Sequence, residues 1–354
     1  MVRRSPDFAH AAPSPGRDQD VATPAVAALD SAQLIDQIAA LPAFQWPWGA
    51  PQEIRIQLLS VHPEPHCTYE IDVRSPSGWH RLIGKAYATD HRDVYEAMEA
   101  LTRAGFGPEE EISIPRPVAY LSSLHLLLQE KVFGTSAKET FTLGDRREWL
   151  AAAEQCGRWL GRFQRLAPPS GKNSGTGRLL QSSERKCRLI TEGDPAWASR
   201  CERLLEELQA GASALDTRLT CPGHGDFCEH QIVLTQRRTV VFDWDLFDIA
   251  HPARDVAKFL VSLERLAMKN HGSVRALDGA GEEFLRAYLG GGGDPHVPAV
   301  VPFYKALFWL KGRTKAFQTQ AAGWREEADM MLTESSRNIA RFTAPPRASP
   351  RRVE

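Results

Sequence analysis

The chain has 354 residues, of which 42% are hydrophobic and 25% are charged, and these values are ordinary for a globular protein. The net charge of −1 gives no overall attraction to nucleic acid or to an acidic membrane, and no apolar run is long enough to span a bilayer. Six cysteines are too sparse in so long a chain to form a disulfide framework, so we expect reduced thiols in a cytoplasmic protein.

The first 28 residues are rich in Pro, Ala, Ser and Asp and show neither helical nor strand periodicity, which predicts a disordered tail. Two arginines near the start are not followed by the apolar core of a signal peptide. After the tail, Asp30 or Ser31 is placed to cap a short helix. The apolar residues on one face of that helix are Leu34, Ile35, Ile38 and Leu41.

Three strands are predicted next. Apolar and polar residues alternate from Ile54 to Leu58 and again over residues 67–73, and a proline-rich turn without glycine lies between them at residues 62–65. The third strand, residues 81–87, contains Lys85 within an apolar run. A buried, unpaired ammonium group is costly, so Lys85 is expected either to bind an anionic oxygen or to lie at an edge and point to water.

A helix is expected over residues 93–104, with Val94, Ala97, Met98 and Leu101 forming its buried stripe. Glu96 and Glu99 lie off this stripe. Two further strands, at residues 118–121 and 124–132, follow a boundary that Pro115 and Pro117 mark.

The rest of the chain is predicted to be largely helical. Residues 170–177, SGKNSGTG, lack the spacing of a phosphate-binding loop and are interpreted as a linker. The final residues, 343–354, have the composition of a solvated basic tail. The expected helices cover residues 148–166, 198–210, 255–268, 279–289, 298–319 and 324–340.

The stretch from Cys221 to Lys258 contains the pattern with the clearest chemistry. It begins with His224-Gly225-Asp226, continues with Gln231, and then forms a predicted hairpin that ends at Asp243-Trp244-Asp245. Closing the hairpin would bring Asp226, Gln231 and Asp243 into one small volume. Three oxygen-bearing side chains suit a hard cation such as Mg²⁺, and they also suit phosphoryl transfer.

An alternative is a zinc site made from Cys221, His224, Cys228 and His230. These residue types are zinc ligands, but the spacing lacks the paired C-x-x-C or H-x-x-x-H elements from which tetrahedral sites are usually built. The phosphoryl-transfer interpretation is therefore favoured.

The order H-G-D, four residues, Gln, and then D-W-D resembles the aminoglycoside phosphotransferase and choline kinase-like family. The following HPARDVA resembles that family's G-D-P-A-x-D-L-A. The resemblance implies an α+β, bilobal protein kinase-like fold with a small, mostly antiparallel β N-lobe and a larger helical C-lobe. We expect a tail at 1–28, the N-lobe at 29–132, the C-lobe at 133–342 and a second tail at 343–354.

The resemblance also implies site residues. Asp226 would be the catalytic carboxylate that accepts or orients a hydroxyl proton, while Gln231 and Asp243 would bind Mg²⁺, with Asp245 as a further ligand. Gln replaces the family's more usual Asn, and the glycine-free turn at 62–65 departs from the glycine or small residues that usually cover the nucleotide phosphates.

On the nucleotide side, Lys85 would bind the α- and β-phosphates and pair with a helix glutamate, Glu96 first and Glu99 second. Backbone groups near Glu130 and Val132 would bind the adenine edge. His224 and Gly225 are expected to shape the loop, and Asp255 to bond back to it.

The expected activity is ATP- or GTP-dependent transfer of the γ-phosphate to a hydroxyl of a small molecule of aminoglycoside, sugar or amino-alcohol type. A catalytically silent nucleotide-binding protein that recognises a partner is the alternative. The expected partners are a nucleotide and a small hydroxylated substrate, with no nucleic acid or membrane. The acceptor, the choice between ATP and GTP, and the oligomeric state stay open.

Overall fold

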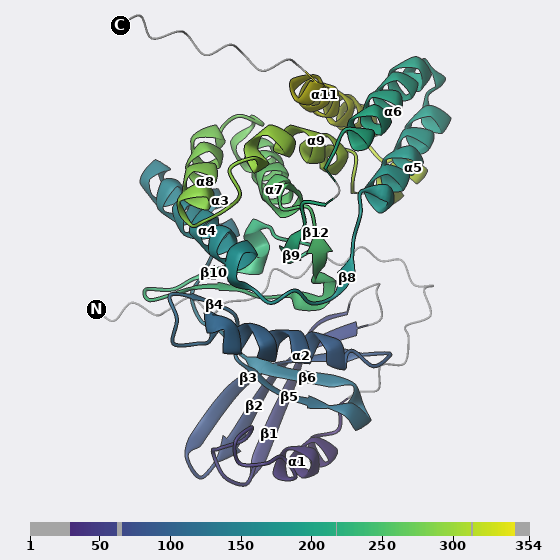
Figure 1. Cartoon of the computed structure of the whole chain (residues 1–354). Helices are drawn as coiled ribbons and strands as arrows, with labels where there is room; N and C mark the ends of the chain where they lie inside the picture. The colour runs from purple at the N-terminus through teal and green to yellow at the C-terminus, as the bar shows by residue number, and fades with distance from the viewer. Residues whose placement is uncertain (1–28, 62–65, 217, 313, 344–354) are drawn as a thin grey trace, which may run out of the picture. The chain divides into compact units, whose positions relative to one another are not determined.

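The computed structural model describes residues 29–61, 66–216, 218–312 and 314–343 (Figure 1). The predicted tail at 1–28, the glycine-free turn at 62–65 and residues 344–354 of the predicted C-terminal tail lie outside these residues. The described chain forms two compact units that divide between Phe133 and Gly134, one residue beyond the predicted boundary.

The first unit is built on a five-stranded antiparallel sheet with the order β1-β2-β3-β6-β5. Helix α1 packs against β1, and helix α2 packs against β5 (Figure 1). The elements of this unit are α1 (Ser31–Ala39), β1 (Glu53–Val61), β2 (His66–Ser75), β3 (Gly78–Tyr87), α2 (Arg92–Leu101), β4 (Ile112–Ser113), β5 (Pro117–Leu121) and β6 (Leu126–Glu130).

Local patterns explain these elements. In β2 the buried positions alternate with less buried ones, as expected for a strand with one face on the core. Helix α1 begins because the Asp30 carboxylate accepts a hydrogen bond from the Gln33 amide at 2.8 Å. Helix α2 buries the predicted stripe but ends at Leu101, before the expected Ala104, because a wider turn containing Gly105 at φ 93° follows.

The second unit is mainly helical. Its helices are α3 (Ala137–Leu143), α4 (Arg146–Leu166), α5 (Gly177–Gly193), α6 (Ala198–Ser213), α7 (Ala253–His271), α8 (Asp278–Gly290), α9 (Val297–Trp309), α10 (Thr314–Gln318) and α11 (Trp324–Thr343). Its short strands are β7 (Thr135–Ser136), β8 (Lys172–Asn173), β9 (Cys221–Gly223), β10 (Ile232–Leu234), β11 (Thr239–Val241) and β12 (Asp248–Ala250). Strand β10 pairs with both β7 and β11, and β12 lies between β8 and β9.

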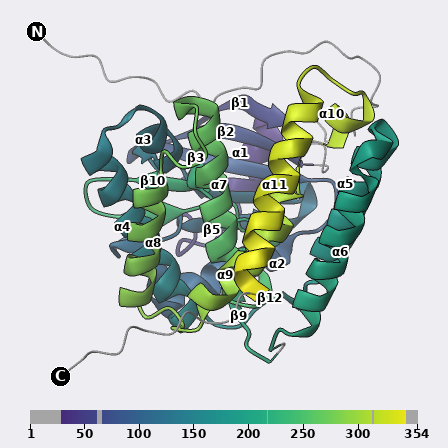
Figure 2. The same ribbon diagram turned by 90° about the horizontal axis from the view of Figure 1, so that it is seen from above.

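The helices of the second unit pack in pairs. Helix α4 lies along α8, α7 and α11 each pack on α9, and α5 lies beside α6 (Figure 2). The closest approach is between α4 and α8, where a Cβ on Gly157 would lie 2.3 Å from the Phe284 carbonyl oxygen. Glycine is therefore required at residue 157 for the two helices to approach this closely.

Three sequence predictions for this unit were wrong. Residues 298–319 form two helices, because Arg265 Nη2 donates to the carbonyl oxygens of Phe308 and Lys311 at 2.9 and 2.6 Å and so caps the end of α9. The predicted linker at 170–177 contains β8, which pairs in parallel with β12. Thr343, assigned from the sequence to the tail, is the last residue of α11.

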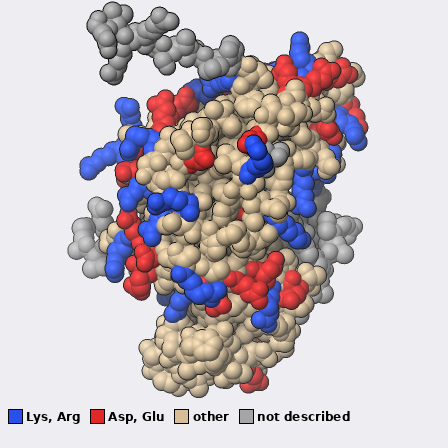
Figure 3. Space-filling model, viewed as in Figure 1, with Lys and Arg blue, Asp and Glu red and all other residues tan. Residues whose placement is uncertain are grey.

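Acidic and basic side chains are interspersed on the face of the molecule in Figure 3, in keeping with the net charge of −1. None of the helices within the described ranges combines the length and the apolarity needed to cross a membrane.

Candidate active site

The predicted hairpin forms at the centre of the site. Ile232 of β10 faces Val241 of β11, and a turn at residues 235–238 joins the two strands. The hairpin brings its two ends together, so that Gln231 Nε2 donates to Asp243 Oδ2 at 2.7 Å. The predicted meeting of Gln231 and Asp243 is therefore present.

Asp243 has a left-handed backbone, with φ 71° and ψ 66°. This conformation is unfavourable for a residue other than glycine, so surrounding structure must hold it in place. The next residue, Trp244, is buried and donates from Nε1 to the Val241 carbonyl oxygen at 3.1 Å. Asp245 follows in the short 3₁₀ turn Trp244–Leu246 and is half-buried. Strain at Asp243 is typical of residues at functional sites.

Asp255 holds the loop that precedes Asp226. Its two carboxylate oxygens accept hydrogen bonds from the backbone amides of His224 at 2.7 Å and Gly225 at 3.3 Å. Asp255 lies in the first turn of α7, and its side chain is almost fully buried. The expectation that Asp255 bonds back to the loop is met by these two contacts.

His224 shapes the same loop from the other side. The Asp226 amide donates to His224 Nδ1 at 3.3 Å, and His224 Nε2 lies 3.0 Å from the Phe242 carbonyl oxygen. Both bonds are satisfied by the tautomer that carries its proton on Nε2. His224 therefore ties the loop to the end of β11 and fixes the backbone at Asp226.

The Asp226 side chain contacts Lys258 of α7. Lys258 Nζ lies 2.7 Å from Asp226 Oδ1, and about a quarter of each side chain is exposed. Burial acts to lower the pKa of Lys258, but the neighbouring Asp226 carboxylate outweighs it, so the pKa is raised and Lys258 stays charged. Lys258 thus places a fixed positive charge beside the proposed catalytic carboxylate.

A buried ion pair supports the loop that carries Asp226. Arg254 makes a two-bonded contact with the Asp248 carboxylate and reaches Asp255 Oδ1 at 3.4 Å from its Nη2 atom. Gly223 fits tightly over this group, since a Cβ there would lie 2.5 Å from the Arg254 guanidinium. The pair links β12, the start of α7 and the loop that carries Asp226.

We expect Gly225→Ala to destabilise the protein by about 2 to 3 kcal/mol, because Gly225 combines a left-handed backbone with a tight contact. Its φ is +85°, and a Cβ would lie 2.0 Å from the Leu246 carbonyl oxygen. Gly272→Ala is the matched control, because Gly272 has a similar φ of +72° and nothing within 4 Å of the added Cβ. Chemical unfolding of both variants should show the larger loss at residue 225, and equal losses would contradict the steric argument.

The four residues of the alternative zinc site do not form one ligand set. His224 uses both ring nitrogens in contacts with the backbone, and Cys221 pairs in β9 with Ala250 of β12. Among the described residues, the ligand atoms that do gather within 4.8 Å of one another belong to Asp226, Cys228 and His230. Burial raises the pKa of the Cys228 thiol well above its ordinary value, which disfavours the thiolate that zinc requires.

The nucleotide-side residues all lie in the first unit. Lys85 lies near the end of β3, between Thr68 of β2 and Leu127 of β6, and the residue is 7% exposed. The edge position with a side chain in water, which the sequence left open for Lys85, is therefore excluded. Glu96 is exposed on α2, whereas Glu99 is half-buried and accepts a hydrogen bond from Tyr95 Oη at 2.9 Å.

Glu130 and Val132 lie at the end of β6 and just beyond it. The Glu130 amide donates to the Arg116 carbonyl oxygen at 2.9 Å, and its carboxylate accepts from the Arg116 amide at 3.1 Å. In the described part of the chain, the backbone of Val132 makes no hydrogen bond. Of the two positions predicted for the adenine edge, Val132 has the more available amide.

The structure thus brings together Gln231 with Asp243 and Asp226 with Lys258. Sequence reasoning missed Lys258, although it lies in the same stretch, three residues after Asp255. Asp255 is in the first turn of α7, so a residue three positions later projects from the same side of the helix. That spacing was the available signal.

The donor set fits a magnesium ion. Gln231 offers an amide oxygen and Asp243 a carboxylate oxygen at the end of a rigid hairpin, and Asp245 is nearby in sequence. Proteins bind Mg²⁺ through such oxygens together with the phosphates of the substrate. Turning the Gln231 amide over breaks its hydrogen bond to Asp243 and places the amide oxygen beside the carboxylate. Two oxygens in that position need a cation between them.

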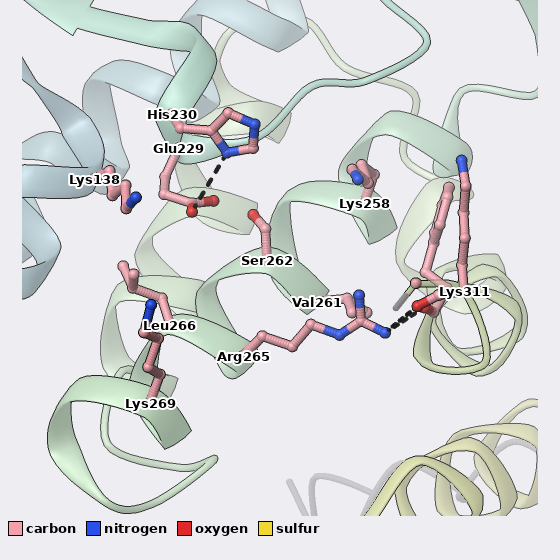
Figure 4. Close-up of a pocket in the computed structure, with 12 residues that line it drawn as sticks. Lys138, Glu229, His230, Lys258, Val261, Ser262, Arg265, Leu266, Lys269 and Lys311 are labelled. Atoms are coloured by element: carbon pink, nitrogen blue, oxygen red, sulfur yellow. Dashed lines mark hydrogen bonds and ion pairs between the residues drawn. The ribbon is translucent and has the colours of Figure 1, made fainter. Parts of the chain in front are cut away.

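A cavity of about 360 Å³ lies in the second unit, and its wall includes Lys258, the partner of Asp226 (Figure 4). Glu229 and His230, from the turn after Asp226, also form part of the wall. The remaining wall residues come from further along α7, from Lys138 of α3 and from the end of α9 and the residues after it. The cavity is within the range of small-molecule binding sites.

The model of the phosphotransferase enzyme family matches residues 81–300, a span that contains every predicted site residue. No curated protein sequence matches the chain. Among solved structures, a choline/ethanolamine kinase family protein from Mesorhizobium loti aligns over 88% of this chain and 98% of its own, with 16% identity and a TM-score of 0.57.

Two further solved structures are similar. One is amicoumacin kinase in complex with AMP-PNP, Ca²⁺ and Ami, with 16% identity and a TM-score of 0.55 over 88% of this chain and 94% of that one. The other is choline kinase from Cryptosporidium parvum, with 11% identity and a TM-score of 0.54 over 85% of this chain and 91% of that one.

The chain belongs to the phosphotransferase enzyme family. The resemblance stated from its H-G-D, Gln and D-W-D pattern is confirmed, as are the kinase-like α+β fold and the expectation of a small-molecule phosphotransferase.

Proposed function

We propose that this phosphotransferase moves the γ-phosphate of ATP or GTP to a hydroxyl group of a small molecule. The observation that carries the proposal is the hairpin contact that places Gln231 against Asp243, downstream of a loop that Asp255 and His224 hold at Asp226. Phosphoryl transfer needs little covalent chemistry from the protein and depends on position and charge, which is what these rigid contacts supply.

In the proposed reaction the acceptor oxygen forms a bond to the γ-phosphorus while the bond to the β-bridging oxygen breaks and the nucleoside diphosphate leaves. Asp226 accepts or orients the proton that the acceptor hydroxyl loses. Its pairing with Lys258 at 2.7 Å holds the carboxylate in one position, so that an acceptor entering the neighbouring cavity meets a fixed oxygen. Lys258 also brings positive charge close to the reacting groups.

Gln231 and Asp243 are the residues proposed to hold Mg²⁺, with Asp245 as a further ligand. The bound cation supplies charge neutralisation on the phosphate oxygens. On the nucleotide side, Lys85 is proposed to bind the α- and β-phosphates, with Glu96 or Glu99 as its helix partner. The Val132 backbone, with Glu130 beside it, is proposed for the adenine edge.

A cytoplasmic location is part of the proposal. All six cysteines are free thiols, and five of them are buried. This pattern suits a reducing compartment, where thiols persist.

We expect wild-type protein with Mg²⁺ and γ-labelled ATP or GTP to transfer label to at least one member of an acceptor panel of aminoglycosides, sugars, sugar acids, sugar phosphates, choline and amino alcohols. Chelation of the metal should abolish transfer, and added Mg²⁺ should restore it. Nucleotide binding with no transfer to any acceptor would instead favour the catalytically silent nucleotide-binding alternative.

A further inference from the structure

The cavity that Lys258 lines is strongly basic. Its charged wall residues are Lys138, Lys258, Arg265, Lys269, Lys311 and one acid, Glu229. In Figure 4, Lys258, Arg265 and Lys311 lie at one end, and Lys138 and Lys269 lie near Glu229 at the other. Five basic side chains thus line the cavity. One of them, Lys258, also contacts the proposed catalytic carboxylate of Asp226.

Two of these cations already have protein partners. Lys258 pairs with Asp226, and Arg265 donates to the carbonyl oxygens at the end of α9. Lys138, Lys269 and Lys311 are exposed, and none of the three has an ion pair with any residue in the described ranges. Although the Lys311 side chain reaches solvent, partial desolvation by the cavity wall, followed by the positive charge of Lys258, lowers its pKa, so an anion here would relieve an existing repulsion.

Glu229, the single acid of the cavity wall, is buried and lies close to His230, so it is poorly placed to bind a cationic ligand. Glu229 is 6% exposed, and its Oε1 lies 3.7 Å from His230 Nδ1. Its other oxygen, Oε2, is buried and lacks a hydrogen-bond partner among the described residues. A buried unpaired acceptor carries a free-energy penalty that a donor from a bound molecule would remove, and an acceptor hydroxyl is such a donor.

We infer that the acceptor of this enzyme is a small hydroxylated anion, with a carboxylate or phosphate group held by Lys311 at the end of the cavity where Lys258 and Arg265 also lie. This inference rests on the proposed function and adds the chemical class of its substrate. A polycationic aminoglycoside would meet five like charges in a cavity of about 360 Å³, where repulsion outweighs one buried glutamate. Two acids outside the cavity wall, Glu283 and Asp329, are already paired, with Arg286 and Arg200 respectively.

Calorimetry on the full chain tests the inference, with saturating Mg²⁺ and AMP-PNP present so that the nucleotide site is filled. The probes are glycerol 3-phosphate, glycerate, uncharged glycerol and the polycation kanamycin. We expect saturable binding of at least one of the two anions and none of glycerol or kanamycin. Comparing glycerol 3-phosphate with glycerate shows whether phosphate or carboxylate is preferred.

Exposed lysines provide variants that preserve the fold. Lys311→Gln should weaken the binding of the preferred anion at least tenfold, and Lys269→Gln, at the other end of the cavity, should weaken it less. Lys315→Gln should leave it unchanged, because Lys315 is exposed on α10 and is not part of the cavity wall. Saturable kanamycin binding without anion binding would overturn the inference. Anion binding that Lys311→Gln does not weaken would also overturn it.

Label transfer from ATP, measured on the same samples, separates this inference from the proposed function. Anion binding without transfer to any acceptor would count against the proposed function and leave the anionic cavity established. Transfer to choline or kanamycin, without anion binding, would support the proposed function and reject the anionic acceptor.

Discussion

Replacing Asp226 by asparagine is expected to lower kcat for phosphate transfer about 10³-fold, the size of effect typical of losing a positioned acid or base. Asparagine keeps the shape of the side chain but cannot accept the acceptor's proton, and it removes the negative charge that holds Lys258 at 2.7 Å. Nucleotide affinity should change little, because the residues proposed to bind the nucleotide belong to the first unit.

The fold of the loop should survive this substitution. The contacts that hold the loop are made by Asp255 and His224 to backbone amides, and the Asp226 side chain takes no part in them. Thermal unfolding of Asp226→Asn should therefore resemble that of wild type. Asp329→Asn is the matched control, since that carboxylate is exposed and pairs with Arg200 on another face.

Steady-state kinetics with the best acceptor of the panel measures the effect on kcat and KM separately. A variant that retains wild-type kcat would remove Asp226 from the mechanism. Lys258→Met tests the ion pair between Lys258 and Asp226 from the other side, because it removes the cation and leaves the Asp226 carboxylate in place. We expect it to lower kcat less than Asp226→Asn does and to change the pH dependence of transfer.

Local sequence patterns predicted much of the fold because local forces decide those parts. The alternation over residues 67–73 predicted β2, and the stripe of Val94, Ala97, Met98 and Leu101 predicted α2. The hairpin after Gln231 was predicted from two apolar runs around a polar turn, and its register follows from the turn length. The contact between Gln231 and Asp243 follows directly from that register.

Features that depend on tertiary packing were not predictable in the same way. Helix α5 was missed because its buried face includes Ser183 and Lys186, so few apolar residues mark it in the sequence. The end of α9 is set by Arg265, which lies 43 residues from the Phe308 carbonyl oxygen that it caps. The basic cavity depends in the same way on segments around Lys138, Lys258 and Lys311, which are distant in sequence and converge only in the fold.

The second large effect is expected at Arg254. Arg254→Met should destabilise the protein by about 3 to 5 kcal/mol, because it leaves the Asp248 and Asp255 carboxylates buried without their cation. Burial acts to lower the pKa of Arg254, but Asp255 and Asp248 raise it above its ordinary value. A raised pKa means that this stabilisation is fully present below the ordinary arginine pKa. The loss should therefore not depend on the protonation of Arg254 between pH 6 and 9.

Denaturant unfolding of Arg254→Met, of Asp248→Leu and of the double variant measures the interaction free energy between Arg254 and Asp248. The double variant should be more stable than the sum of the two single losses predicts, because neither residue is then left buried and unpaired. Arg286→Met removes an exposed partner of Glu283 and should have no measurable effect. Strict additivity in the double variant would contradict the coupling inferred from the bidentate geometry.

Transfer activity should fall in Arg254→Met even at temperatures where the variant remains folded. Arg254 touches Asp255, Asp255 holds the amides of His224 and Gly225, and these amides fix the backbone that carries Asp226. Removing the guanidinium leaves Asp255 free to shift, and a displacement of about 1 Å at a reacting group can reduce the rate about 10²-fold. A lower kcat with unchanged nucleotide affinity would show that the buried pair positions the catalytic carboxylate in addition to stabilising the fold. Unchanged kcat in the folded variant would limit its role to stability.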